Sequence, residues 1–254
     1  MTAQLSISPN AAVSLRVLHA DEHLLVLFKP AGLVTQPGVD HTDDTVLNGL
    51  FATHGTTLQN LGKARDFGLI HRLDRPTSGL LVVGLTAVGY DGLRAQFAER
   101  SVKKTYVALV QGVPNPAEGV IRAPLAEVQR GGRKQAVVRG PGAQPAETGY
   151  KTLASAPRGP TLVECDLLTG RLHQIRAHFA DRGHPIVGDR EYGRRNELDQ
   201  AFREAVPQAI GLHAGGLMFT HPVTGGRLTV HAPLPAPFVA FLTAVGVACP
   251  RRWR

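Results

Sequence analysis

The stretch HRLDRPTSGL, residues 71–80, places a single carboxylate, Asp74, between Arg72 and Arg75. A histidine precedes this group, and a Pro-Thr-Ser-Gly turn follows it. An acid in basic surroundings is either an ordinary surface ion pair or a carboxylate kept ionised for chemistry on an anionic substrate. The stretch alone does not decide between these interpretations.

Arg176 is the second polar residue of interest, in the segment TGRLHQIRAHFADRGHP. We expect a helix that begins near Thr169, and in it Arg176 shares the spacing of an apolar stripe with Leu172, Ile175 and Phe179. Either the guanidinium reaches water from the edge of the stripe, or it is buried and paired with a carboxylate. In the second case Asp74 is a candidate partner, which a bidentate contact would hold ionised and oriented.

Tyr106 lies in KKTYVALVQG, which alternates like a strand and places Tyr106, Ala108 and Val110 on one face. Its ring either packs in the core with the hydroxyl at the edge, or forms a flat surface on which a base pulled from its helix can stack. Both interpretations stay open.

The other reactive side chains do not assemble into a recognisable site. The chain has 11 histidines, but those of HQIRAH are five positions apart and do not share a helical face, so we expect no metal. We expect packing or hydrogen-bonding roles at loops and strand ends for His213, His221 and His231. No glycine-rich segment matches a phosphate-binding pattern, so we expect no cofactor. A glycoside hydrolase that uses one carboxylate remains an alternative.

Composition indicates a polyanionic partner. The net charge is +8, with 28 Lys and Arg against 20 Asp and Glu. The two cysteines, Cys165 and Cys249, are far apart and predict neither a disulfide framework nor a zinc ribbon. We find no signal peptide and no membrane span, and we expect a cytoplasmic monomer with no membrane partner.

Strands and helices alternate without regular βαβ units, which predicts an α+β fold with a mainly antiparallel sheet. Asp74 is expected on a loop that leads into a buried strand at 79–84, and 129–147 is expected to be a mobile basic loop. The predicted organisation has three parts: a flexible N-terminus at 1–11, one catalytic domain at 12–249, and a basic tail at 250–254.

The chain closely resembles the RluA-type family of RNA pseudouridine synthases. The similarity runs in order from about Arg16 to Pro233. The blocks that carry it are HLLVLFKPAGLVTQPG, HRLDRPTSGLLVVG, KKTYVALVQG, TGRLHQIRAHFADRGHPIVGDREYG and LHAGGLMFTHPVTG.

This resemblance implies the pseudouridine synthase fold around a central RNA-binding cleft, and an enzyme that detaches uracil from its ribose, rotates it and rejoins it through carbon. Asp74 would be the catalytic carboxylate, either attacking the anomeric carbon or removing a ribose proton. Tyr106 would stack on the target base, Arg176 would pair with Asp74, and Arg72 would fill the gap left by the flipped nucleotide. The family uses neither metal nor cofactor.

The chain departs from the family pattern in two respects. Phe28 stands where the family often has asparagine, which puts a local hydrogen bond in doubt. We also expect no N-terminal ribosomal-protein-like module, so RNA contacts should come from the catalytic domain, including the basic runs at 130–139 and 190–195 and the tail, although each run could be an ordinary solvated face. The expected RNA-binding residues are Arg72, Arg75, Thr77, Lys104, Arg130, Arg133, Lys134, Arg171 and His173.

Besides the hydrolase that uses one carboxylate, two classes of function therefore compete. The first is an isomerase that converts specific uridines of structured RNA to pseudouridine, with ribosomal RNA favoured and transfer RNA second. The second is an RNA-binding or ribosome-associated protein that retains the fold without turnover. The presence of Asp74, Tyr106 and Arg176 together favours the enzyme.

Overall fold

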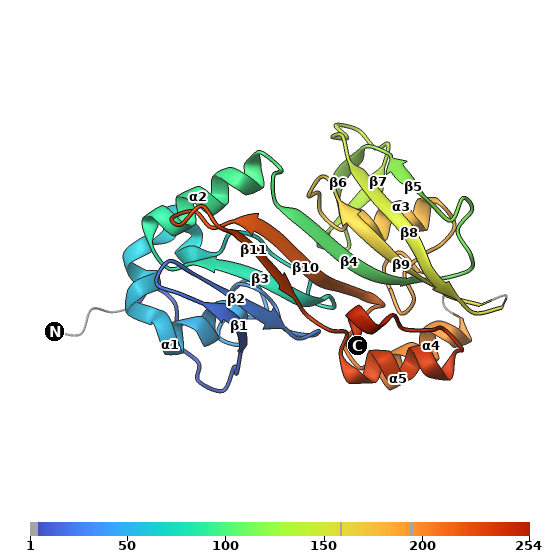
Figure 1. The fold of residues 1–254 in the computed structure, drawn as a ribbon, viewed down its shortest axis with the longest axis horizontal. Coiled ribbons are helices and arrows are strands. Elements are labelled where there is room, and N and C mark those ends of the chain that lie inside the picture. Colours follow the sequence, from blue (N-terminus) through green and yellow to red (C-terminus); the bar gives the residue numbers. More distant parts are fainter. Residues whose placement is uncertain (1–4, 158, 194–195) are drawn as a thin grey trace. The chain divides into compact units, whose positions relative to one another are not determined.

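A computed structural model describes residues 5–157, 159–193 and 196–254, which form two compact units (Figure 1). The first unit contains the chain up to Val102 together with Leu217–His231. The second contains Lys103–Gly216 together with Ala232–Arg254. The sequence predicts one catalytic domain over residues 12–249, and that boundary stays a prediction.

The first unit is built on strands in the order β1-β2-β3-β10, with β11 beside β10. The central strands are apolar on both faces as expected, because the side chains of Leu24–Leu27 and Leu80–Val83 are fully buried. The elements of this unit are β1 (Arg16–Ala20), β2 (Leu24–Lys29), α1 (Val46–Leu61), the 3-10 helix η1 (Lys63–Gly68), β3 (Ser78–Gly84), α2 (Ala87–Ala98), the last residues of β10 (Leu212–Thr220), and β11 (Arg227–His231).

The second unit has the strand order β10-β4-β9-β8-β5 and a separate two-stranded sheet, β6-β7. The registered strand pairs of both units are antiparallel, which confirms the α+β class with a mainly antiparallel sheet. The remaining elements are β4 (Lys103–Val110), β5 (Glu118–Arg122), β6 (Leu125–Arg130), β7 (Arg133–Val138), β8 (Glu147–Ser155), β9 (Thr161–Leu167), α3 (Gln174–Asp181), α4 (Glu197–Ala205), α5 (Ala236–Ala244) and the 3-10 helix η2 (Arg251–Trp253).

The sequence predicts a loop for most of the basic segment 129–147, and this prediction is wrong for residues 129–138. They belong to the β6-β7 hairpin, in which Arg130 pairs with Arg133 across the turn. Gly131 and Gly132 occupy that turn with φ of 54° and 75°, a conformation that suits a two-residue hairpin connection. The prediction failed because the glycines were interpreted as the mark of a loop and not of a hairpin turn.

Helix α3 begins later than expected, at Gln174 and not near Thr169. His173 has φ of 48°, in the left-handed region, so the helix cannot extend back through it. The Gln174 side-chain oxygen accepts hydrogen bonds from the Thr169 hydroxyl at 2.6 Å and the Arg171 amide at 3.1 Å, which stabilises the turn before the helix.

The C-terminal residues are packed against the core of the second unit. Trp253 is 2% exposed and lies so close to Gly215 that a side chain at that position would meet the indole ring. Arg252 pairs with Glu164 of β9. The segment predicted as a basic tail, 250–254, is therefore anchored by its tryptophan. None of the helices in the described part of the chain has the length and apolar character that crossing a membrane would require.

The buried His213 of β10 predicts acid sensitivity. Burial lowers its pKa to about 4, while its Nε2–H donates to the Ala232 carbonyl at 3.1 Å. Between pH 6.5 and 4 the unfolded chain binds a proton that the folded chain does not, so the free energy of unfolding should fall by about 3 kcal/mol as the pH decreases across this range.

In His213→Gln, urea unfolding at several pH values should show a smaller dependence on pH in this range, because the amide does not titrate. Substitution of the exposed His231 by Gln is the control. If the free energy of unfolding of His213→Gln fell with decreasing pH as steeply as that of the parent, His213 would not be the source of the acid sensitivity.

Candidate active site

Asp74 lies in the first unit, on the loop that precedes β3, as predicted. The Thr77 amide donates to the Asp74 carbonyl at 3.0 Å and forms the turn. Arg75, the residue after Asp74, connects this loop to the Pro-Ala-Gly loop after β2. The Gly32 amide donates to the Arg75 carbonyl at 2.8 Å, and Arg75 Nε donates to the Gly32 carbonyl at 3.1 Å. Each loop therefore limits the movement of the other.

A buried lysine strengthens this connection. Lys29 Nζ donates to the carbonyl oxygens of Pro30 at 2.9 Å, Leu33 at 2.8 Å and Arg75 at 3.2 Å, and Lys29 is 0% exposed. Burial lowers the pKa of Lys29 to about 7, and the negative charge of Asp74 acts in the opposite direction. Three carbonyl acceptors require three N–H donors, which only the ammonium form provides. When all three hydrogen bonds of Lys29 are made, this residue therefore places a buried positive charge close to Asp74.

The start of the Asp74 loop is held by side chains of the same unit. The His71 ring stacks on Phe97 of α2, with the ring centroids 4.9 Å apart, and His71 Nε2 accepts the Val82 amide at 3.2 Å. The Thr35 hydroxyl donates to the Leu73 carbonyl at 3.0 Å. The backbone that carries Asp74 is thus fixed on both sides of this residue.

Tyr106 and Arg176 belong to the second unit. Tyr106 lies on β4, as predicted, opposite Cys165 of β9, and is 9% exposed. Arg176 is 4% exposed, so the interpretation in which it reaches water is wrong. Its pairing with Asp74 stays a prediction.

Within its own unit Arg176 has two carboxylate partners. Nε donates to Asp189 Oδ2 at 2.7 Å and Nη2 to Asp189 Oδ1 at 3.0 Å, while Nη2 also donates to Glu191 Oε2 at 2.8 Å. Asp189 Oδ1 accepts the backbone amides of Glu191 at 2.9 Å and Tyr192 at 3.2 Å as well. The buried Asp189 carboxylate is therefore neutralised and hydrogen-bonded on both oxygens.

Sequence reasoning missed the residues that support the predicted site. Asp189 and Glu191 were part of the GDREYG motif, but no role was assigned to either. The available signal was the presence of two acids in a short segment after the helix that places Arg176 among apolar residues. For Lys29 the signal was a lysine that directly follows the buried run LLVLF.

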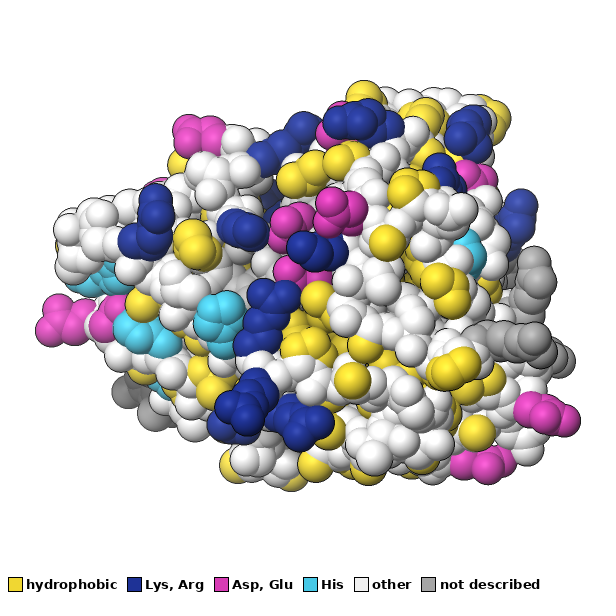
Figure 2. All heavy atoms as spheres, turned by 45° about the vertical axis from the view of Figure 1, so that its right-hand side comes forward, with side chains coloured by type: hydrophobic (Ala, Val, Ile, Leu, Met, Phe, Trp, Pro, Cys, Tyr) yellow, Lys and Arg dark blue, Asp and Glu magenta, His cyan; other side chains and the backbone are white. Residues whose placement is uncertain are grey.

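The predicted RNA-binding residues differ in exposure. Arg72, Arg75 and Arg171 are exposed, as are Arg130, Arg133 and Lys134 at the end of the β6-β7 hairpin, and Lys104 is half-buried. Thr77 is 2% exposed and His173 is largely buried, so little of either side chain is accessible to RNA. On the face drawn in Figure 2, Lys and Arg form several separate groups with Asp and Glu between some of them. Of the run 190–195, Arg194 and Arg195 lie outside the described residues.

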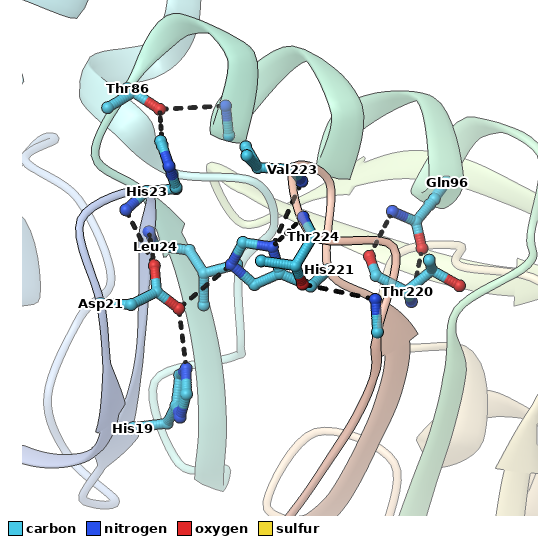
Figure 3. A network of polar contacts seen from close by, with 12 residues as sticks. His19, Asp21, His23, Leu24, Thr86, Gln96, Thr220, His221, Val223 and Thr224 are labelled. Carbon is cyan, nitrogen blue, oxygen red and sulfur yellow. Dashed lines mark hydrogen bonds and ion pairs between the residues drawn. The ribbon is translucent and has the colours of Figure 1, made fainter.

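The histidines near the β10-β11 turn have a hydrogen-bonding role, as Figure 3 shows for His221. Asp21 Oδ2 accepts from His19 Nε2 at 2.9 Å and from His221 Nε2 at 3.1 Å. His221 Nδ1 accepts the amides of Val223 at 3.2 Å and Thr224 at 3.1 Å, so this ring connects two turns of the first unit. The described part of the chain contains no group of three or more His, Cys, Asp or Glu side chains placed to hold a metal ion.

Comparison with known proteins identifies the class. The RNA pseudouridylate synthase family matches residues 23–181. The ribosomal large subunit pseudouridine synthase D of Zymomonas mobilis is 38% identical over 224 residues, which cover 88% of this chain and 70% of that protein. Its counterpart of the same name in Pseudomonas aeruginosa is 40% identical over 241 residues, with coverage of 91% and 72%.

The solved structure of human RNA pseudouridylate synthase domain containing 4 has a TM-score of 0.69 and 27% identity, covering 93% of this chain and 95% of the human chain. The chain belongs to the RNA pseudouridylate synthase family, which confirms the resemblance that its motifs carry. It is an enzyme that isomerises uridine to pseudouridine in RNA.

The contacts of Lys29 predict that this residue orders the Asp74 loop. In Lys29→Met the three carbonyl oxygens lose their donor, and the Gly32 amide that bridges the two loops should exchange its hydrogen about tenfold faster. Native-state hydrogen exchange measures this effect. Lys63→Met, at an exposed position of the same unit, is the control, and equal protection of Gly32 in both variants would contradict the role given to Lys29.

Proposed function

We propose that this enzyme acts on ribosomal RNA of the large subunit and that Asp74 performs the chemistry. The names of the relatives from Zymomonas mobilis and Pseudomonas aeruginosa support this choice of RNA. The observation that carries the role of Asp74 is its loop, which hydrogen bonds and the buried Lys29 hold in place. A cytoplasmic location and a monomer that needs neither metal nor cofactor complete the proposal.

The reaction is an isomerisation in which atoms balance without a second substrate. The bond between N1 of uracil and C1′ of ribose breaks, a bond between C5 and C1′ forms, C5 loses a proton and N1 gains one. Asp74 either attacks C1′ or removes a ribose proton, and a carboxylate can do both. Both routes require the carboxylate to be ionised and fixed against the ribose.

Two residues of the second unit assist Asp74 in this proposal. Tyr106 stacks on the uracil after the nucleotide has left its helix, and the flat ring on a rigid strand suits this contact. Arg176 pairs with Asp74 while its Nε and Nη2 hold Asp189 and Glu191, and only a guanidinium has several donor nitrogens for such separate contacts. Asp189 and Glu191 fix the orientation of that guanidinium in the folded chain.

Exposed cations supply the phosphate contacts. Arg72 and Arg75 flank the catalytic loop, and Arg72 occupies the position left by the flipped nucleotide. Arg130, Arg133 and Lys134 present positive charge at the end of the β6-β7 hairpin, where the phosphate backbone can be held without regard to sequence.

Asp74→Asn tests the proposal. The amide keeps the shape of the side chain but is neither a nucleophile nor a base, so single-turnover formation of pseudouridine should fall at least about a thousandfold. RNA affinity and the free energy of unfolding should stay close to those of the parent. Mapping of carbodiimide-resistant uridines in ribosomal RNA treated with each variant measures the product and its position.

The matched control is Asp91→Asn, which removes an exposed carboxylate of the same unit that pairs with Arg65. This variant should retain activity. Parental rates in Asp74→Asn would show that another residue performs the chemistry. Modification of transfer RNA but not ribosomal RNA by the parent would contradict the proposed substrate alone.

A further inference from the structure

Tyr192 lies where three parts of the second unit meet. Its hydroxyl accepts the Ala136 amide of β7 at 2.7 Å and lies 2.9 Å from Nδ1 of His173, the residue before α3. Cζ of Arg176 lies over its ring, 4.9 Å from the ring centroid. One side chain thus contacts the hairpin, the start of α3 and the guanidinium.

The hydroxyl can make both contacts at the same time. It must accept from Ala136, because an amide can only donate, and its own proton can then be donated to Nδ1 of His173. Burial raises the pKa of Tyr192 to about 12, so the phenol keeps this proton near neutral pH. Both contacts therefore hold the hydroxyl in one orientation, with the ring directed at Arg176.

The hairpin depends on this region for its position. A two-stranded hairpin is marginally stable by itself, so β6-β7 needs support from the rest of the unit. Ala136 is three residues from Arg133 at the turn, which is about 10 Å along a strand. The apolar cluster that supports the hairpin includes Leu125, Ala136, Ala146 and Ala177, with Val138 and Tyr192 packed against them.

Packing alone does not require the hydroxyl. A phenylalanine would fill the same space and keep an aromatic face beside the guanidinium. The hydroxyl adds the specific connection to the β7 backbone. Arg176 in turn is held by Asp189 and Glu191, the residues that lead directly to Tyr192.

We propose that the Tyr192 hydroxyl is a positioning group that links the β6-β7 hairpin to Arg176, so that RNA held by the hairpin arginines steadies the guanidinium during catalysis. The inference rests on the proposed function, in which Arg130 and Arg133 contact RNA and Arg176 assists Asp74. If the hydroxyl carries this coupling, its loss should make the chemical step insensitive to what the hairpin binds.

The test is a double-mutant cycle on single-turnover rates at saturating RNA. Its variants are Tyr192→Phe, the pair Arg130→Ala with Arg133→Ala, and all three together. Tyr192→Phe should slow the chemical step about tenfold, as expected for loss of a buried hydrogen bond, with RNA affinity nearly unchanged. Removing the hairpin arginines should slow the chemical step of the parent but not that of Tyr192→Phe.

Hydrogen exchange at the Ala136 amide gives a readout independent of activity, and it should be faster in Tyr192→Phe. The control is Tyr150→Phe, which removes another hydroxyl of the same unit, bonded to the Pro116 carbonyl at 2.9 Å, while its ring stays packed on Phe179. In the Tyr150→Phe background the hairpin substitutions should slow the reaction as they do in the parent.

Two results would overturn the inference, and a third would affect the proposed substrate alone. If the rate reduction in the triple variant equalled the product of the reductions from Tyr192→Phe and from the two hairpin substitutions, the hydroxyl and the hairpin would act independently. This result would overturn the inference even if the parent enzyme is fully active. Unchanged exchange at Ala136 would show that the hydroxyl does not hold β7. If the parent failed to modify ribosomal RNA while converting another RNA normally, only the proposed substrate would be wrong, and the cycle on the active RNA would still decide the coupling.

Discussion

The buried contact between Arg176 and Asp189 is the interaction on which the second unit depends. Removing either ion from water costs several kcal/mol, so each can remain buried only because the other neutralises it. The contact attaches α3 to the segment that contains Glu191 and Tyr192, and Tyr192 contacts β7 in turn. The orientation of one guanidinium is therefore linked to the position of a helix, a turn and a hairpin.

The first unit uses a buried charge in a similar way. Lys29 gathers carbonyl oxygens from the loop after β2 and from the loop of Asp74, where no secondary structure would satisfy them. A catalytic carboxylate must be held within a fraction of an ångström of its target, and loops do not provide this unless other groups fix them. The buried lysine and arginine each convert an irregular segment into a fixed support.

The sequence predicts more of the apolar framework than of these polar supports. A run that is apolar on both faces predicted β3, alternation predicted β4, and helical spacing placed Arg176 on an apolar stripe. The hairpin at Arg130–Arg133 was missed because Gly-Gly marks a tight turn and a loose loop equally well. The apolar run before Lys29 indicates that this residue is buried, but its partners are backbone carbonyls that no side-chain pattern reveals. Charge, spacing and strand pattern singled out Asp74, Tyr106 and Arg176, but only the resemblance assigned a role to each of them.

Single-turnover conversion by Arg176→Lys tests most directly whether Arg176 orients Asp74, the proposed catalytic carboxylate. Lysine keeps the charge that Asp189 needs, whereas a neutral residue would leave that carboxylate unpaired and cost about 3–5 kcal/mol of stability. An ammonium lacks the planar fork, and misplacing a catalytic group by about 1 Å can cost on the order of a hundredfold in rate. The account predicts a fall of that size with RNA affinity and folding preserved, and a rate close to that of the parent would contradict it.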